Sequence, residues 1–389
     1  MPAANKRELK YAFWTEARMS KPHAPNIPSL DGIRAISVLI VVLSHSGFTA
    51  VPGGLGVTIF FFLSGYLITT LMLVEREQTG AIDIPKFYAR RVLRLMPPLL
   101  ITLVVAYSLT YAGWLPGGIS LYGLAAQVTY FANYYAIFFD PGNTVPDGTG
   151  ILWSLAVEEH FYIIYPLLIS LLLGNSIRLR TIAALLGLGC LVILAWRMYL
   201  IYSPGFTPLR TYYASDTRID SIIYGCILAV AVNPVKALHR GGAMSPRQWA
   251  LFTLAGCVLL VTLLYRNETF REGIRYSLQG LALMPIFYFA IRFSDVQPFR
   301  FLNWPLVKRV GVYSYAIYLS HYVVIRLFVA DFPWVAEKPY LMFPAALLIS
   351  IAFAAVIDRF VDPYFRQLRR QLRPGAVLRS AVLAARGRP

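Results

Sequence analysis

Long apolar runs separated by short polar segments dominate the hydropathy pattern of the chain. Ten of these runs are long enough to cross a bilayer as helices: 33–51, 54–74, 96–116, 151–173, 181–202, 215–233, 248–265, 277–291, 310–330 and 341–358. A membrane-spanning helix needs about 20 mostly apolar residues. An eleventh run, at 120–139, is rich in tyrosine and phenylalanine and is ambiguous. The pattern predicts an all-α, polytopic membrane protein.

Charge in the connecting segments decides how 120–139 is arranged. Lysine and arginine collect in the cytoplasmic loops of membrane proteins and thereby set their orientation. Asp140 and Asp147 lie in an outer-type loop without basic residues. Basic residues collect instead in 75–94, 174–180, 234–247, 292–309 and the tail after 358. These segments share one side only if 120–139 does not cross. We therefore expect about ten spans, a re-entrant or interfacial helix at 120–139, and both termini in the cytoplasm.

We expect a single membrane domain at 29–360 between two cytoplasmic tails, 1–28 and the basic 361–389. The polar N-terminal residues are followed by no short apolar region with a cleavage site, so no cleavable signal is expected. The run at 33–51 is long enough to remain in the membrane as an anchor.

Composition supports a membrane protein and limits its partners. Hydrophobic residues make up 57% of the 389 residues and charged residues only 14%, whereas soluble domains carry about 25% charged residues. Basic cytoplasmic loops account for the net charge of +17, so we expect no nucleic-acid partner. Cys190, Cys226 and Cys257 lie inside apolar runs without metal-ligand spacing. We interpret them as small packing residues and expect no metal.

The first apolar run contains an arginine and a histidine eleven positions apart, Arg34 and His45. Because an α-helix turns about 100° per residue, both side chains fall on one face, about 16 Å apart. We expect Arg34 at the cytoplasmic mouth and His45 mid-helix, near mid-depth of the bilayer. A snorkelling arginine and a buried neutral histidine are the alternatives. An ionisable group at that depth is a functional candidate, and imidazole suits proton abstraction near neutral pH.

Two further arginines, Arg91 and Arg94, precede the proline pair Pro97 and Pro98. At a spacing of three residues they share one helix face. One interpretation is an amphipathic basic helix lying on anionic lipid. The other is a forked set of donors for phosphate groups. Sequence physics alone leaves both interpretations open.

The segment 153–162 places two carboxylates and an imidazole inside a predicted span. Glu158, Glu159 and His160 follow one another directly, about 10 Å below the outer end of the helix. Adjacent ionisable groups within a span have few purely structural explanations. An outer-interface cap whose charges reach water is one of them. We interpret the two glutamates as candidate catalytic residues.

Ionisable residues also occur in two later spans. Asp216, Arg218 and Asp220 open the segment 215–233, and on physical grounds we expect a structural ion pair within the membrane there. His321 lies in the middle of the span 310–330. A satisfied packing residue and a functional residue are both open interpretations of that histidine.

Taken in order, these motifs resemble the acyltransferase-3 family of integral membrane O-acyltransferases, which includes polysaccharide and lipopolysaccharide O-acetyltransferases. The family combines an arginine–histidine motif with a ten-residue gap, an arginine-x-x-arginine motif before prolines, a tryptophan–serine–leucine motif with a glutamate pair, and a late serine–tyrosine to histidine element. The matching residues are Arg34 with His45, Arg91 with Arg94, 153–162 and 314–321. The resemblance covers roughly 28–372.

Two positions depart from the family pattern. The second helix often has an acidic residue where this chain has Thr58, and a glutamine is usual where His160 stands. Thr58 puts in doubt a charge relay through that position. Some relatives carry an additional esterase-like domain, which we do not expect in this chain.

The resemblance implies acyl transfer from an acyl-coenzyme A donor, commonly acetyl-CoA, to a hydroxyl of a lipid-linked or exported saccharide. We assign His45 as general base, with Glu158 or Glu159 orienting it or the acceptor. We assign coenzyme A binding to Arg34, Arg91 and Arg94. The residues assigned to substrate binding are Trp153, Ser154, Arg218 and His321. The expected location is a bacterial cytoplasmic (inner) membrane.

Three alternatives stay open at this point. Polar groups at mid-depth also suit a transporter of an acyl group or small molecule, although no inverted repeat with paired broken helices is evident. The acceptor is alternatively a small-molecule hydroxyl rather than a saccharide or glycolipid. Direct transfer and a covalent acyl-histidine relay are both compatible with the motifs.

Overall fold

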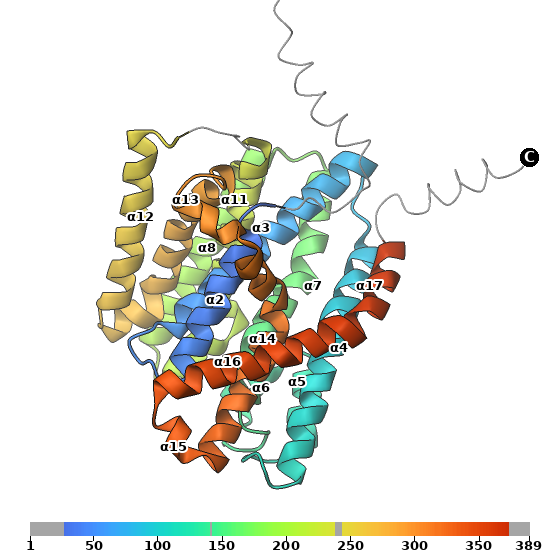
Figure 1. Cartoon of the computed structure of the whole chain (residues 1–389). Helices are drawn as coiled ribbons and strands as arrows, with labels where there is room; N and C mark the ends of the chain where they lie inside the picture. Colours follow the sequence, from blue (N-terminus) through green and yellow to red (C-terminus); the bar gives the residue numbers. More distant parts are fainter. Residues whose placement is uncertain (1–26, 141, 238–242, 373–389) are drawn as a thin grey trace, which may run out of the picture.

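The computed structural model describes residues 27–140, 142–237 and 243–372, and within these residues it forms helices and no strand (Figure 1). Each of the ten predicted spans coincides with a helix. These are α2 (Leu30–His45), α3 (Gly53–Thr79), α4 (Ile84–Tyr111), α7 (Trp153–Gly174), α8 (Leu179–Ile201), α11 (Asp220–Ala231), α12 (Pro246–Leu264), α13 (Arg275–Arg292), α14 (Pro305–Asp331) and α16 (Pro339–Val356).

Eight helices of the described residues are long and apolar enough to cross a membrane. This confirms the all-α, multi-pass prediction. The two remaining helices are shorter, with 16 residues in α2 and 12 in α11. The total of ten crossings and the orientation of the termini therefore stay predictions.

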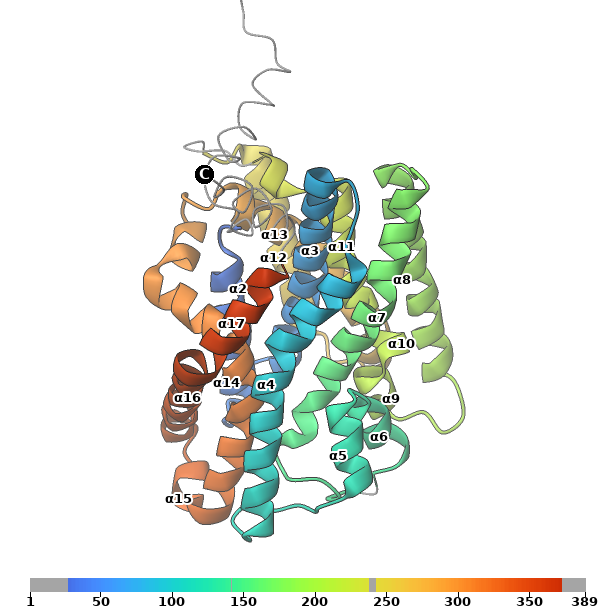
Figure 2. The same cartoon turned by 90° about the vertical axis from the view of Figure 1, so that its right-hand side faces the viewer.

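Short helices connect the long ones. The predicted re-entrant or interfacial segment 120–139 consists of two of them, α5 (Leu121–Val128) and α6 (Ala132–Phe138). Neither is long enough to cross a bilayer. They lie beside the lower parts of α4 and α7 (Figure 2). The other short helices are α9 (Pro208–Tyr213), α10 (Ser215–Arg218) and α15 (Pro333–Ala336).

The C-terminal part of the described chain is one long oblique helix across the bundle (Figure 1). It runs from α16 through a π-helical turn, Ile357–Val361, into α17 (Asp362–Gln371). A π-turn adds one residue to a helical turn and often lies at a functional site. Arg369 of α17 donates a hydrogen bond to the carbonyl of Leu93 on α4 at 3.1 Å. The helix α17 is thereby fixed beside the Arg91–Arg94 segment.

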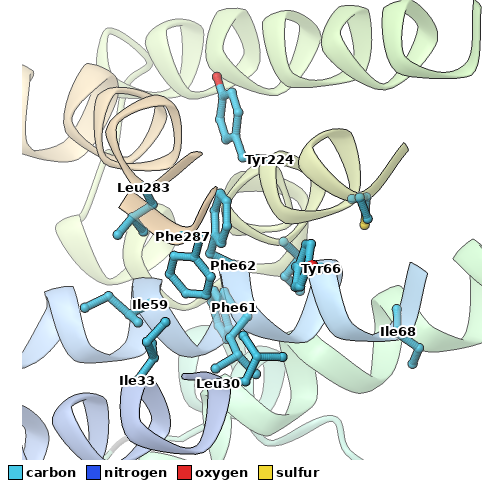
Figure 3. Close-up of a cluster of buried hydrophobic side chains, with 14 of the residues drawn as sticks. Leu30, Ile33, Ile59, Phe61, Phe62, Tyr66, Ile68, Tyr224, Leu283 and Phe287 are labelled. Atoms are coloured by element: carbon cyan, nitrogen blue, oxygen red, sulfur yellow. The ribbon is translucent and has the colours of Figure 1, made fainter. Parts of the chain in front are cut away.

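The centre of the bundle is built on close contact between α3 and α11. A Cβ on Gly65 would lie 2.0 Å from the Ile222 carbonyl oxygen, and a Cβ on Gly225 would lie 2.0 Å from that of Phe62. Only glycine permits two helix backbones to approach so closely. Around this contact, Phe61, Phe62 and Tyr66 of α3 pack with side chains of α2, α11 and α13 (Figure 3).

The first predicted span is shorter than its apolar run. The run covers 33–51, but α2 ends at His45 and the residues up to Pro52 form a loop. Gly47 has a φ of 98°, the left-handed conformation in which helices commonly end. His45 is therefore the last residue of its helix and not mid-helix as we expected. The hydropathy pattern missed this because the loop residues Phe48, Ala50 and Val51 are themselves apolar.

The α3–α11 contact gives a first prediction. Gly225→Ala should lower the free energy of unfolding by about 1–3 kcal/mol, because the new methyl group forces the two helices apart. Gly189→Ala on α8 is the matched control, since a Cβ there meets no atom within 4 Å. Melting temperatures of the purified protein in detergent compare them. Equal melting temperatures for both variants would contradict the packing described.

Candidate active site

A pair of histidines joins α2 to α14. Nδ1 of His45 lies 2.9 Å from Nε2 of His321. The two rings are nearly parallel, with an interplanar angle of 6°, and the ring of Tyr322 lies 4.5 Å from that of His45. His321 is completely buried, whereas His45 is partly exposed. The two histidines stand 276 positions apart in the chain.

Hydrogen bonding fixes the protonation pattern of this pair. Nδ1 of His321 lies 2.7 Å from the carbonyl oxygen of Tyr318, which can only accept, so this nitrogen carries the proton. Nε2 of neutral His321 is then an acceptor, and it accepts a hydrogen bond from the Nδ1–H group of His45. The remaining nitrogen, Nε2 of His45, therefore has a free lone pair. This is the arrangement of a general base held by a second group.

Close approach of α2 and α14 makes the pair possible. A Cβ on Gly311 of α14 would lie 1.8 Å from the carbonyl oxygen of Asp31 on α2. A glycine at this position allows the two backbones to touch. The histidine pair lies further along the same two helices.

The two glutamates of α7 form one cluster with Arg91 of α4. Arg91 Nε donates to Glu159 Oε1 at 3.0 Å, and its Nη2 lies 3.9 Å from Glu158 Oε2. The guanidinium carbon stands 3.0 Å from the ring centroid of Tyr162. We expected one glutamate to orient His45 or the acceptor; the structure joins both glutamates to Arg91 and joins His45 to His321. Sequence reasoning placed these residues in two separate groups and did not predict their pairing.

The other two arginines of the predicted donor set have different surroundings. Arg34 pairs with Asp31 one turn before it, at 2.8 Å. Arg94 is exposed and, among the described residues, forms no hydrogen bond or ion pair. It interacts electrostatically with Arg34, Arg91 and Arg369. The structure thus brings the three predicted arginines together and adds Arg369, which we had counted only as part of a basic tail.

Trp153 and Ser154 begin α7 next to the histidine pair. Ser154 Oγ lies 2.7 Å from the hydroxyl of Tyr318. The ring of Tyr318 in turn lies 5.6 Å from that of His321. Trp153 stacks on Tyr213 at 4.8 Å with an interplanar angle of 7°. These residues connect the start of α7 to the His45 site through side-chain contacts.

The structural ion pair expected at 215–233 forms, but its basic partner comes from another helix. Neither aspartate pairs with Arg218. Asp216 pairs with Arg210 at 2.5 Å, and Asp220 pairs with Arg197 of α8 at 2.8 Å. Because α10 ends at Arg218 and α11 begins at Asp220, the three side chains do not follow one continuous helix. Their partners come from other segments, which the sequence spacing does not reveal.

His160 has a role that the motif did not predict. Its Nδ1 lies 2.6 Å from Ser215 Oγ, which also accepts a hydrogen bond from Asn133 Nδ2 at 3.0 Å. The ring packs between Phe131 and Tyr134. It therefore ties α7 to α6 and α10 and does not bond to the adjacent glutamates. In the described ranges, no group of three or more histidine, cysteine, aspartate or glutamate side chains could hold a metal ion.

A helical membrane bundle with an oriented histidine base, a basic cluster and a partly buried carboxylate pair has the components of a membrane acyl-transfer site. The chain belongs to the acyltransferase-3 family, since the family model described as an acyltransferase domain matches residues 27–359. This confirms the resemblance inferred from the motifs.

Two curated relatives show how far the similarity extends. The chain is 35% identical over 323 residues to peptidoglycan O-acetyltransferase OatA of Listeria monocytogenes, which covers 77% of this chain and 50% of the relative. It is 29% identical over 369 residues to O-acetyltransferase OatA of Staphylococcus aureus, covering 90% of this chain and 59% of the relative. The chain thus spans about half the length of these relatives. No solved structure matches it.

The Arg91 cluster gives a second prediction. Arg91→Gln leaves the two glutamates without their cation and should lower the free energy of unfolding by about 1–3 kcal/mol. Arg94→Gln, three residues along the same helix, is the matched control because Arg94 pairs with no carboxylate of the residues that the structure describes. Thermal unfolding in detergent should show a lower melting temperature for the Arg91 variant only. Parallel losses in both variants would contradict the assigned pairing.

Proposed function

We propose that the protein is a membrane O-acyltransferase. It moves an acetyl or other short acyl group from cytoplasmic acyl-CoA to a hydroxyl of a lipid-linked or exported saccharide. The observation that carries this proposal is the free Nε2 lone pair of His45, held by His321 in a bundle of the acyltransferase-3 family. The names of the relatives favour acetyl as the acyl group and a cell-wall saccharide as acceptor.

In the proposed reaction, His45 Nε2 takes the proton of the acceptor hydroxyl as its oxygen attacks the thioester carbonyl. The new oxygen–carbon bond forms, the carbon–sulfur bond breaks, and the proton passes from His45 to the departing coenzyme A thiolate. His321 acts as a positioning residue. Both of its ring nitrogens are hydrogen-bonded, so it has none left for a substrate, and we replace its predicted substrate-binding role with this one.

Coenzyme A is polyanionic, and its phosphates match the basic cluster of Arg34, Arg91, Arg94 and Arg369. Arg94 is the best placed of these to receive a phosphate, because no carboxylate of the described residues occupies it. The cluster and His45 are separated by most of the length of α2, eleven residues or about 16 Å. The long, thin pantetheine arm suits that separation. We propose that the basic end faces the cytoplasm of a bacterial inner membrane, with both termini on that side.

Glu158 and Glu159 hold Arg91 in this arrangement. Their carboxylates fix a guanidinium that would otherwise be free to leave the site, and they limit the net charge at that depth. Trp153 and Ser154, at the start of α7, are the residues that we assign to acceptor binding. Their contacts with Tyr213 and Tyr318 are the support for an acceptor-binding role.

The base gives a third prediction. His45→Ala should lower kcat by about 100-fold or more, the usual contribution of a general base. The assay follows labelled acetyl groups from acetyl-CoA into membrane glycans. His160→Gln is the matched control, a partly buried imidazole of α7 that bonds to Ser215 and not to His45 or His321. Wild-type transfer by the His45 variant would exclude the proposed mechanism. Thioester cleavage in detergent, without sealed vesicles, separates the enzyme from a transporter.

The positioning role of His321 gives a fourth prediction. His321→Leu removes the acceptor for the Nδ1 proton of His45 and should reduce kcat by about 10-fold to 100-fold with little change in KM for acetyl-CoA. His321→Gln retains a side-chain acceptor and should restore part of the lost rate. The check is a kcat and KM comparison for both variants. A merely structural role would make leucine and glutamine equivalent or move KM as much as kcat.

A further inference from the structure

Two arginines are completely buried in the described part of the chain, and only one of them has a counter-ion. Arg197 Nη1 lies 2.8 Å from Asp220 Oδ2. Arg218 donates one hydrogen bond, from Nη2 to Thr58 Oγ1 at 3.2 Å, and pairs with no carboxylate. Its Nε and Nη1 atoms are buried without any hydrogen-bond partner.

Aromatic rings surround the Arg218 guanidinium. Its carbon lies 3.7 Å from the ring centroid of Tyr276, 5.3 Å from Tyr212, 5.6 Å from Phe61 and 5.9 Å from Trp153. The negative faces of such rings attract a cation that has lost its water. They leave its full positive charge in place, because aromatic rings carry no net charge.

A buried guanidinium without a counter-ion is unfavourable, and it cannot become neutral because arginine keeps its proton. Its unpartnered N–H groups are donors in the geometry that binds carboxylates. A second cation beside the same tyrosine ring, Arg275, has its guanidinium carbon 4.8 Å from the Tyr276 ring centroid and already pairs with Glu272 at 3.9 Å. The single positive charge of Arg218 is neutralised by one carboxylate. A phosphate monoester fits less well, because it brings a charge close to −2.

The guanidinium is linked to the proposed reaction centre through a chain of neighbouring side chains. It contacts Trp153, whose neighbour Ser154 bonds to Tyr318, and Tyr318 lies against His321. We infer that Arg218 binds a carboxylate carried by one of the two substrates, the acceptor saccharide or the acyl group. This inference rests on the proposed acyl transfer and narrows its substrate class to one that includes an acidic partner.

The experiment has a donor arm and an acceptor arm, both with the purified full-length chain. The donor arm compares kcat/KM for succinyl-CoA and acetyl-CoA, which differ by one terminal carboxylate. The acceptor arm compares the extracted cell-wall glycan before and after carbodiimide amidation of its carboxylates. In one arm the wild type should prefer the carboxylate form by about 10-fold to 100-fold, the range of a charged hydrogen bond. If kcat/KM is the same with and without the carboxylate in both arms, the inference is overturned.

In the Arg218→Gln variant, the ratio of kcat/KM for the carboxylate form to that for the neutral form should fall to about one. If both forms of the substrate lose rate equally, the arginine has only a structural role and the inference fails. Arg197→Gln is the matched control for stability, because it leaves Asp220 buried without a partner. The Arg197 variant should melt at a lower temperature than the wild type, and the Arg218 variant should not. A similar fall in melting temperature in both variants would contradict the conclusion that Arg218 has no counter-ion.

A third variant supplies the missing anion from within the protein. Thr58→Asp places a carboxylate where Thr58 now accepts the Arg218 hydrogen bond, and Thr58→Asn is its neutral control. The aspartate should raise the melting temperature relative to asparagine and remove the preference for carboxylate substrates. Equal melting temperatures overturn the inference. A wild-type protein that cleaves no thioester contradicts the proposed function instead, and the two melting temperatures still decide the carboxylate site.

Discussion

The hydrogen bond between His45 and His321 is the contact on which the rest of the candidate site depends. It joins the last residue of α2 to α14, and it exists because Gly311 lets the two backbones touch. The carbonyl of Tyr318 sets the proton on His321, and His321 then sets the proton on His45. A single backbone oxygen thereby determines that Nε2 of His45 is available as a base. This is the same logic by which a second group orients a catalytic or metal-binding histidine in soluble enzymes.

The surrounding charges follow from the low polarity of the bundle interior. A charge taken out of water must find a partner nearby. Arg91 finds the two glutamates of α7, and Arg197 finds Asp220. Arg94 remains exposed, and Arg218 is the exception that has aromatic rings in place of a counter-ion. The basic cluster and Arg218 thus have different surroundings: Arg94 reaches solvent, whereas the Arg218 guanidinium is enclosed by aromatic rings.

Much of the fold was readable because bilayer thickness imposes a length on every crossing helix. All ten predicted spans coincide with helices, and 120–139 forms no single crossing helix. The errors have physical reasons. Apolar loop residues after His45 extended the first run beyond the helix end at Gly47. A break between α10 and α11 separated Arg218 from Asp220, and Asp216 pairs with Arg210 instead. Hydropathy records how apolar a segment is, but not where its backbone turns.

The sequence by itself determined the class of protein, the helices and the motif residues His45, Arg91 and Glu158–Glu159. Length, periodicity and local spacing carry that information, because each concerns residues close together in the chain. Only the tertiary structure decided which of these residues meet. It paired His45 with His321, the glutamates with Arg91, and left Arg218 without an anion. Such pairings depend on how closely helices pack and on which faces turn toward each other, and those distances arise only when the whole bundle assembles.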